Sequence, residues 1–254
     1  MKSLFIKSFK KLDKKFIFVI LLDFLFYASL IIAFFLFSKL VMWSIGSLYT
    51  LPGKLMAMSK MSGLEQLGTS AESASILLNQ FKSKIVLSMI AFWFMIVLAF
   101  TLFKGAAWSF VTKQKINKKF FKYVFKFNLI WFGVFALLGA ILFFVTKPAV
   151  TGIALLVLSI IALYLTPISY ALFNPKKSIK DLFKRLWHVA VERIYLFILP
   201  ALIAIAVLFG LLIIISSILV RIVPEFIALP ILLIIVVWQS WSKYYIYLVA
   251  RKIK

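Results

Sequence analysis

Two ionisable side chains lie inside segments that are otherwise apolar, and they are the first candidates for chemistry. Asp23 lies about seven residues from one end of the apolar run Phe16–Phe37, and Lys104 about seven residues from one end of the run Ile85–Val111. Ionisable groups inside a membrane are energetically costly, so they mark a candidate functional site. Because consecutive spans are antiparallel, both side chains lie at one depth, about 10 Å inside the boundary at roughly 1.5 Å per residue. The two positions predict an ion pair.

Other polar side chains fall at a similar depth or nearer the boundary. Asn128 begins the third apolar run, and Gln239 and Lys243 lie near the end of the last one. If these helices face one another, Asp23, Lys104, Asn128, Gln239 and Lys243 form an intramembrane polar cluster. Amide side chains in such a cluster also tie helices together by hydrogen bonds.

Two interpretations of this cluster remain open. In the first, Asp23 is a cation or proton site in a water-filled vestibule or a headgroup-sized pocket, and Asp23→Asn abolishes flux without harming the fold. In the second, Asp23 and Lys104 form a structural ion pair, or Lys104 snorkels to the interface. A structural pair predicts that Asp23→Asn destabilises the protein and that replacing both residues by apolar ones restores its stability.

Familiar enzyme chemistry is poorly supported. The chain has no cysteine and one histidine, which excludes disulfides, thiolate metal sites and clusters of imidazole ligands. His188 and Glu192 lie one helical turn apart, a spacing that suits an acid and a base working on a lipid headgroup but equally a solvated helix face. The sequence shows none of the common catalytic or phosphate-binding motifs. We therefore expect no cofactor, no metal site and no catalytic residues.

Composition identifies the surroundings of these residues. Of 254 residues, 65% are apolar and 15% charged, and the mean hydropathy is +1.10, which excludes an ordinary soluble domain. The long, nearly uncharged runs lack the alternation of a membrane β-barrel, so they predict an all-α polytopic membrane protein. We expect a single six-span domain with spans at about residues 16–37, 85–111, 124–146, 149–173, 194–220 and 226–250.

Charge gives the orientation. Most of the 30 basic residues lie in the N-terminal segment, the second and fourth connections and the C-terminal tail. Positively charged loops stay in the cytoplasm, so both termini are expected on the cytoplasmic side of the cell membrane. The only long connection, residues 46–84, falls outside. It is expected to carry an interfacial helix, and Thr69 with Glu72 forms a capping box that would begin a helix leading into the second span.

An internal repeat precedes the odd-numbered spans. Residues 5–16, 116–127 and 179–190 are similar basic, amphipathic stretches, and Ser178 with Asp181 is a capping box for the third. The chain thus reads as three hairpins, each preceded by an in-plane helix whose apolar face lies in the headgroup boundary. The alternative is that these are ordinary positive flanks of spans that begin early. Lipid headgroup contacts are expected from Lys10, Lys11, Lys14, Lys15, Lys118, Lys119, Lys122, Lys180, Lys184 and Arg185.

This arrangement of three hairpins, each opened by a Phe- and Lys-rich stretch, resembles uncharacterised polytopic proteins related to the membrane domain found beside glycerophosphodiester phosphodiesterases. The resemblance covers the whole chain as topology and implies a membrane-embedded accessory or scaffold, without the catalytic domain and its acidic metal ligands. The amino-acid usage, which is rich in lysine, isoleucine and phenylalanine, suggests a prokaryotic source.

The favoured function is a non-enzymatic scaffold that organises anionic lipid, or a membrane-protein partner, at the inner leaflet; no nucleic-acid partner is expected. The alternative is a small-solute or lipid permease with an inward vestibule around Asp23. A lipid-headgroup enzyme is the least favoured interpretation.

Overall fold

Every regular element in the described part of the chain is helical. The structure is a computed structural model, and it describes residues 6–9, 12–59, 64–175, 177–195, 197, 209–210, 213 and 228–252. Its elements are α2 (Lys15–Ser59), α3 (Leu64–Ala99), the π-helical turn η1 (Phe100–Lys104), α4 (Gly105–Thr112), α5 (Lys118–Val145), α6 (Pro148–Leu172), α7 (Ile179–Leu186), the π-helical turn η2 (Trp187–Val191) and α9 (Ala228–Lys252). The all-α class is confirmed.

Five of the described segments are long and apolar enough to cross a membrane: Lys15–Gly46, Asn79–Thr112, Lys118–Val145, Val150–Leu172 and Pro230–Lys252. They correspond to predicted spans one to four and six, the first three being longer than expected. Their surfaces carry large apolar side chains, such as Phe144 and Leu163, at 84% and 76% exposure. Surfaces of this kind are stable against hydrocarbon and unfavourable in water. The predicted fifth span, residues 194–220, lies almost wholly outside the described residues.

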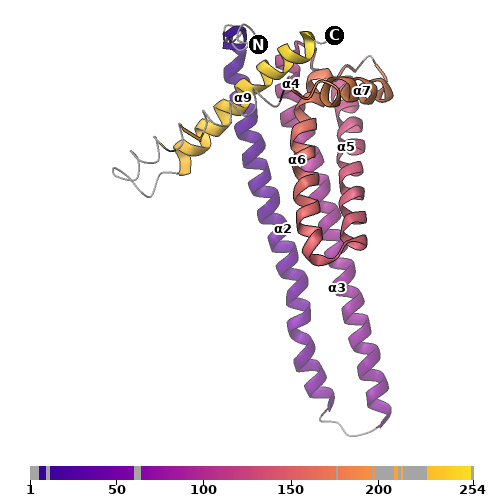
Figure 1. The fold of residues 1–254 in the computed structure, drawn as a ribbon. Coiled ribbons are helices and arrows are strands. Elements are labelled where there is room, and N and C mark those ends of the chain that lie inside the picture. The colour runs from indigo at the N-terminus through magenta and orange to yellow at the C-terminus, as the bar shows by residue number, and fades with distance from the viewer. Residues whose placement is uncertain are drawn as a thin grey trace. The chain divides into compact units, whose positions relative to one another are not determined.

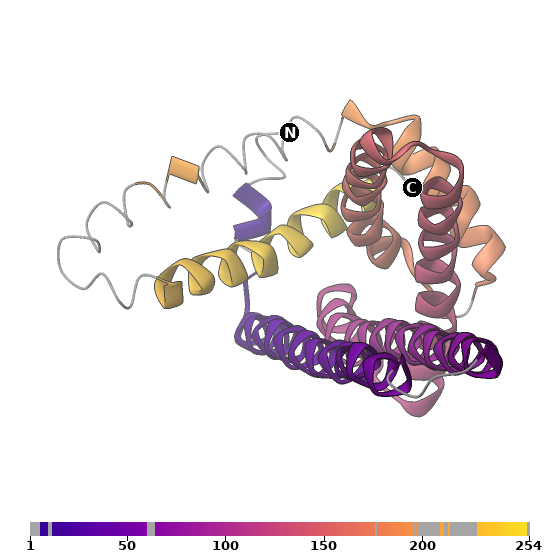
Figure 2. The same ribbon diagram turned by 90° about the horizontal axis from the view of Figure 1, so that it is seen from below.

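The described chain divides into two compact units, one made of residues 27–99 and one of residues 1–26 with 100–254. In the first unit, α2 and α3 lie side by side as an antiparallel hairpin (Figures 1 and 2). Phe37 stacks on Phe92 with ring centroids 4.6 Å apart, and Lys84 lies 4.2 Å from the ring centre of Trp43. Aromatic stacking and a cation–π contact therefore join the two helices.

The expected helix start at Thr69 is wrong. α2 continues to Ser59 and α3 begins at Leu64, so Thr69 lies inside α3 rather than at its cap. A capping box marks a helix start only where the preceding residues stop being helical, and here Leu64 to Gly68 continue the helix.

In the second unit, α5 and α6 form a hairpin whose turn is at Thr146 and Lys147. Lys147 is the N-cap of α6, and Pro148 follows it at the first position, where the missing N–H costs nothing. The hydroxyl of Thr146 lies 2.8 Å from that of Thr151. The hairpin brings the start of α5 and the end of α6 to the same end of this unit, and α7 lies across that end (Figure 1). α9 packs against α6 and α4.

The core of this unit is aromatic and tightly packed. Phe127, Trp131 and Tyr170 are buried. The ring centroid of Phe127 lies 5.8 Å from that of Trp131 and 5.6 Å from that of Tyr170. Gly105 allows α4 to approach α5, because a Cβ at that position would meet Val124 Cγ1 at 2.8 Å. Without a glycine there, α4 or Val124 would have to shift.

The three basic stretches differ in structure, which corrects the predicted repeat. The second forms no separate helix: Asn117 is the N-cap of α5, its Oδ1 accepting from Phe120 N at 2.7 Å, so residues 118–127 are the first turns of the span. The first stretch is helical at residues 6–9, and α2 begins only at Lys15, whose N–H donates to Asp13 Oδ1 at 3.0 Å. The alternative interpretation, that a basic stretch is simply the first part of a span that begins early, therefore holds for the second stretch.

The third stretch is a helix, α7, with the predicted cap. Ser178 Oγ accepts from Asp181 N at 3.1 Å and donates to Asp181 Oδ2 at 2.8 Å. That hydrogen bond from the Ser178 hydroxyl lowers the pKa of Asp181 below its ordinary value. A charged Asp181 in the first turn suits the positive end of the helix dipole.

Protein covers much of the apolar face of the third stretch but only part of that of the first, where Phe9 is still 46% exposed. Leu182 and Leu186 of α7 are buried in the core of the second unit, and Phe183 packs on Trp131 with ring centroids 5.8 Å apart. In the first stretch, Phe9 stacks on Trp241 of α9 at 4.8 Å. Periodicity predicts an apolar stripe but does not distinguish lipid from protein as its cover.

Candidate functional site

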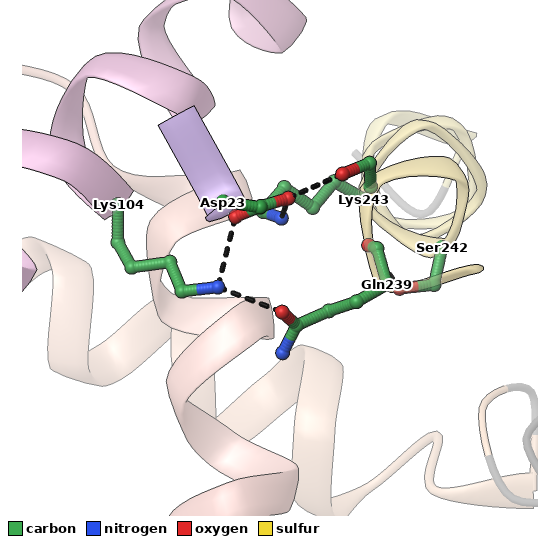
Figure 3. A network of polar contacts seen from close by, with 6 residues as sticks. Asp23, Lys104, Gln239, Ser242 and Lys243 are labelled. Atoms are coloured by element: carbon green, nitrogen blue, oxygen red, sulfur yellow. Dashed lines mark hydrogen bonds and ion pairs between the residues drawn. The ribbon is translucent and has the colours of Figure 1, made fainter. Parts of the chain in front are cut away.

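A buried cluster of charged residues joins α2, η1 and α9 within the second unit. Lys104 Nζ donates to Asp23 Oδ1 at 2.8 Å and to Gln239 Oε1 at 2.8 Å. Lys243 Nζ donates to Asp23 Oδ2, and the Ser240 hydroxyl donates to the same oxygen at 2.5 Å. Figure 3 shows Asp23 between the two lysines, with Lys104 reaching on to Gln239. The predicted pair of Asp23 and Lys104 is present, and Lys243 makes it a triad.

Local helix geometry explains how these side chains meet. Gln239, Ser240 and Lys243 fall on one side of α9 because residues three and four apart share a helix face. Lys104 is the last residue of η1, and a π-helical turn rotates the residues after it relative to an ordinary α-helix. Such turns recur at functional sites. Lys104 Nζ also lies 4.3 Å from the ring centre of Phe26, one turn along α2 from Asp23.

The cluster is closed to solvent, and its carboxylate is bonded at both oxygens. The side chain of Asp23 is 0% exposed, those of Lys104 and Lys243 are 6% and 4% exposed, and both carboxylate oxygens of Asp23 accept hydrogen bonds from ammonium groups. One carboxylate therefore neutralises part of the charge of two ammonium groups. Buried charges persist only when they are paired and hydrogen-bonded, which this arrangement achieves. Chemically, it suits holding three helical segments together.

Asn128 belongs to a second, separate network. Its Nδ2 donates to Thr101 Oγ1 at 3.0 Å, and the Tyr170 hydroxyl donates to its Oδ1 at 2.5 Å. The predicted five-residue cluster is therefore two networks, which share the turn η1 because Thr101 and Lys104 both lie on it. The sequence pattern identified neither Thr101 nor Tyr170 as part of the site, and both are only 3% exposed. A buried tyrosine hydroxyl needs a partner, but periodicity does not reveal which tyrosine is buried.

Tyr170→Phe is expected to lower the free energy of unfolding by about 1 to 3 kcal/mol, because it leaves the buried Asn128 Oδ1 without this donor. The measurement is unfolding in mixed micelles by added denaturing detergent, followed by tryptophan fluorescence. Tyr195→Phe removes the same hydroxyl from a side chain that is 63% exposed, and its effect should stay within about 0.5 kcal/mol. Equal effects of the two variants would contradict a role for the Asn128 network.

The predicted lipid-contacting cations lie mostly on the surface. Lys14, Lys15, Lys118, Lys119, Lys122, Lys180 and Lys184 are exposed and Arg185 is half-buried, while Lys10 and Lys11 lie outside the described residues. Except for Lys14 and Lys15, the described members of this set lie at the start of α5 and on α7, at one end of the second unit. We call the exposed cations Lys118, Lys119, Lys122, Lys180, Lys184 and the half-buried Arg185 the basic end.

His188 and Glu192 contact each other through Nδ1 and Oε2 across η2, and their side chains are 50% and 51% exposed. Half-exposed groups of this kind are typical of a solvated helix face. No group of three His, Asp or Glu side chains within the described residues is placed to hold a metal ion.

Comparisons of the chain with protein-family models, with curated proteins and with solved structures find no match. The class of protein follows from the fold and composition: it is an all-helical protein with several helices that suit a membrane. The resemblance to proteins related to the glycerophosphodiester phosphodiesterase membrane domain stays a prediction.

Proposed function

We propose that the chain is a non-enzymatic integral membrane protein that organises anionic lipid, or a membrane-protein partner, at the inner leaflet. It crosses the membrane six times, as three hairpins, with both termini in the cytoplasm. In this arrangement the start of α5, the end of α6 and helix α7 lie at the cytoplasmic surface. The proposal rests on the basic end.

The observation that carries the proposal is that the described residues leave the basic end with an excess of positive charge: Asp181, whose charge interacts with that of Lys184, is one carboxylate beside six cations. None of its six cations forms an ion pair with a described residue. α7 is held by its buried leucines and by the Tyr164 hydroxyl, which donates to Ala190 O of the adjoining η2 at 2.8 Å. Lys180 and Lys184 therefore project from a fixed helix. A row of fixed, unpaired cations attracts anionic headgroups by about 1 kcal/mol each.

The geometry of Asp23 favours this proposal over a permease. A cation or proton site in a vestibule needs a carboxylate oxygen that a solute can reach. Asp23 is 0% exposed, and both its oxygens are bound by ammonium groups of its own chain. The closed triad supports a structural role for Asp23.

Replacing Lys180, Lys184 and Arg185 together with glutamine is expected to weaken the preference for anionic lipid by about fivefold or more. Loss of about 1 kcal/mol, the attraction of one cation at the lipid surface, already corresponds to about fivefold. The protein is reconstituted into bilayers containing dansyl-labelled phosphatidylglycerol or phosphatidylcholine, and energy transfer from tryptophan gives the preference. The wild-type preference should also fall at 1 M salt, where the Debye length shrinks to about 3 Å.

The matched control is the triple variant Lys39→Gln, Lys82→Gln and Lys147→Gln, which removes three exposed cations that lie outside the basic end. It should keep the preference at the wild-type level. An equal loss in both variants, or no wild-type preference for phosphatidylglycerol, would refute the proposal. Glutamine keeps the helix propensity of lysine, so α7 is expected to remain folded.

A further inference from the structure

A cavity of about 1050 Å³ opens at the basic end of the second unit, beside the connection between α4 and α5. Its walls come from residues 112–123, from residues 171–175 at the end of α6 and just after it, and from the last turns of α9. This volume is just above the range usual for small-molecule sites, roughly 300 to 1,000 Å³. The cavity is separate from the Asp23 triad, none of whose residues lines it.

The lining of the cavity is strongly cationic. Lys113, Lys115, Lys119 and Arg251 line it, and no Asp or Glu is among the described residues that do. Lys113 is the only described non-glycine residue with a positive φ, 59°, and it ends α4 in the left-handed conformation. Glycine or asparagine adopts that conformation more easily than lysine does. A lysine at this position therefore has a small backbone cost, which a role for its charge would explain.

The cavity also meets the N-terminal end of α5, a helix of 28 residues. Asn117, Lys119 and Phe120 from its first turn are lining residues. Asn117 Oδ1 accepts from only one of the N–H groups that begin the helix, that of Phe120. The N-terminal N–H groups and the helix dipole add positive potential to that of the four cations.

Gln114 supplies the second, independent feature. Its Nε2 donates to Phe173 O at 2.7 Å, which fixes the amide, while its buried Oε1 has no hydrogen-bond donor among the described residues. Gln114 is a lining residue of the same cavity. A buried acceptor without a donor is unfavourable. Because this oxygen has almost no exposed surface in the ligand-free chain, the Gln114 side chain has to shift slightly before a ligand hydroxyl can donate to it.

We propose that this cavity binds a phosphate group carried on a hydroxyl-bearing molecule. Lys113, Lys115, Lys119 and Arg251 neutralise the phosphate, and Gln114 accepts a hydrogen bond from a hydroxyl. The phosphate belongs either to a polyol lipid headgroup or to a free polyol phosphate, which share this chemistry. The lipid form of this inference rests on the proposed function, because it requires the cavity to lie at the lipid surface; the soluble form does not.

The test is isothermal titration of the full chain in an uncharged detergent with glycerol 3-phosphate, dioctanoyl phosphatidylglycerol and dioctanoyl phosphatidylcholine. We expect saturable binding of one or both of the first two and none of phosphatidylcholine. Binding of phosphatidylglycerol alone identifies a lipid source, and binding of glycerol 3-phosphate alone identifies a soluble one. Lack of saturable binding by both would overturn the proposal.

The decisive variant is Lys113→Asn with Arg251→Gln. It should weaken binding by about 10-fold or more, because each removes a charge-assisted hydrogen bond to the phosphate. Asparagine tolerates the left-handed conformation better than lysine, so thermal stability should be unchanged or higher, which separates lost binding from lost folding.

The matched control is Lys180→Gln with Lys184→Gln on α7, which removes two cations that do not line the cavity. Its affinity should stay within about twofold of wild type, since exposed charges are screened over about 10 Å at 0.1 M salt. If the control loses as much affinity as the cavity variant, the proposal fails. The proposed function is judged separately, by the bilayer preference of the α7 variants.

Discussion

Asp23→Asn is expected to lower the free energy of unfolding by about 3 to 5 kcal/mol, the largest loss we expect from a single substitution in this chain. The asparagine occupies the same space but carries no charge, so the ammonium groups of Lys104 and Lys243 would remain buried beside each other without their carboxylate. Removing one partner of a buried ion pair costs far more than the pair contributes, because the remaining charge is still desolvated. Unfolding in mixed micelles, followed by tryptophan fluorescence, gives the free energy.

Asp13→Asn is the matched control for this substitution. Asp13 is exposed, and its Oδ1 caps the start of α2 by accepting from Lys15 N at 3.0 Å. Asparagine caps helices as well as aspartate does, so the free energy of unfolding should change by less than about 0.5 kcal/mol. If Asp23→Asn proved as mild as Asp13→Asn, Asp23 would not be a structural ion-pair partner, and a transport role would become the better explanation.

The position of a residue within its apolar run was enough to predict part of the site. Counting residues from the ends of two apolar runs placed Asp23 and Lys104 at the same level, and their side chains are 2.8 Å apart. The capping serine of α7, Ser178, was also predicted as such. These successes share a cause: each depends on positions along one helix or two consecutive helices, which the sequence states directly.

Which side of a helix contacts which neighbouring segment could not be predicted from the sequence. No sequence pattern indicates the π-helical turn η1, which places Thr101 beside Asn128 and Lys104 beside Asp23. Nor does an amphipathic pattern show what covers the apolar side of α7, which contacts protein rather than headgroups. Both features depend on contacts between segments far apart in the chain, which no local pattern encodes.

The second large effect concerns the number of partners in the buried cluster. A two-residue ion pair predicts that apolar replacement of Asp23 and Lys104 together restores stability, as expected from the sequence. The structure adds Lys243, whose ammonium group contacts the other carboxylate oxygen. Asp23→Leu with Lys104→Met would leave Lys243 buried alone, at 4% exposure. We expect this double variant to remain about 3 to 5 kcal/mol less stable than wild type.

Adding Lys243→Met to that double variant should recover most or all of the loss, and it brings the protein to within about 1 to 2 kcal/mol of wild type or above it. Replacement of a whole buried ion cluster by apolar residues of similar volume is often neutral or stabilising, because no desolvated charge remains. The residual cost comes from Ser240 and Gln239, which lose the carboxylate and the ammonium group that they contact. Full recovery in the double variant, with no further gain on adding Lys243→Met, would show that Lys243 is not part of the charge balance. Recovery only in the triple variant would establish a three-residue cluster whose members have to be exchanged together.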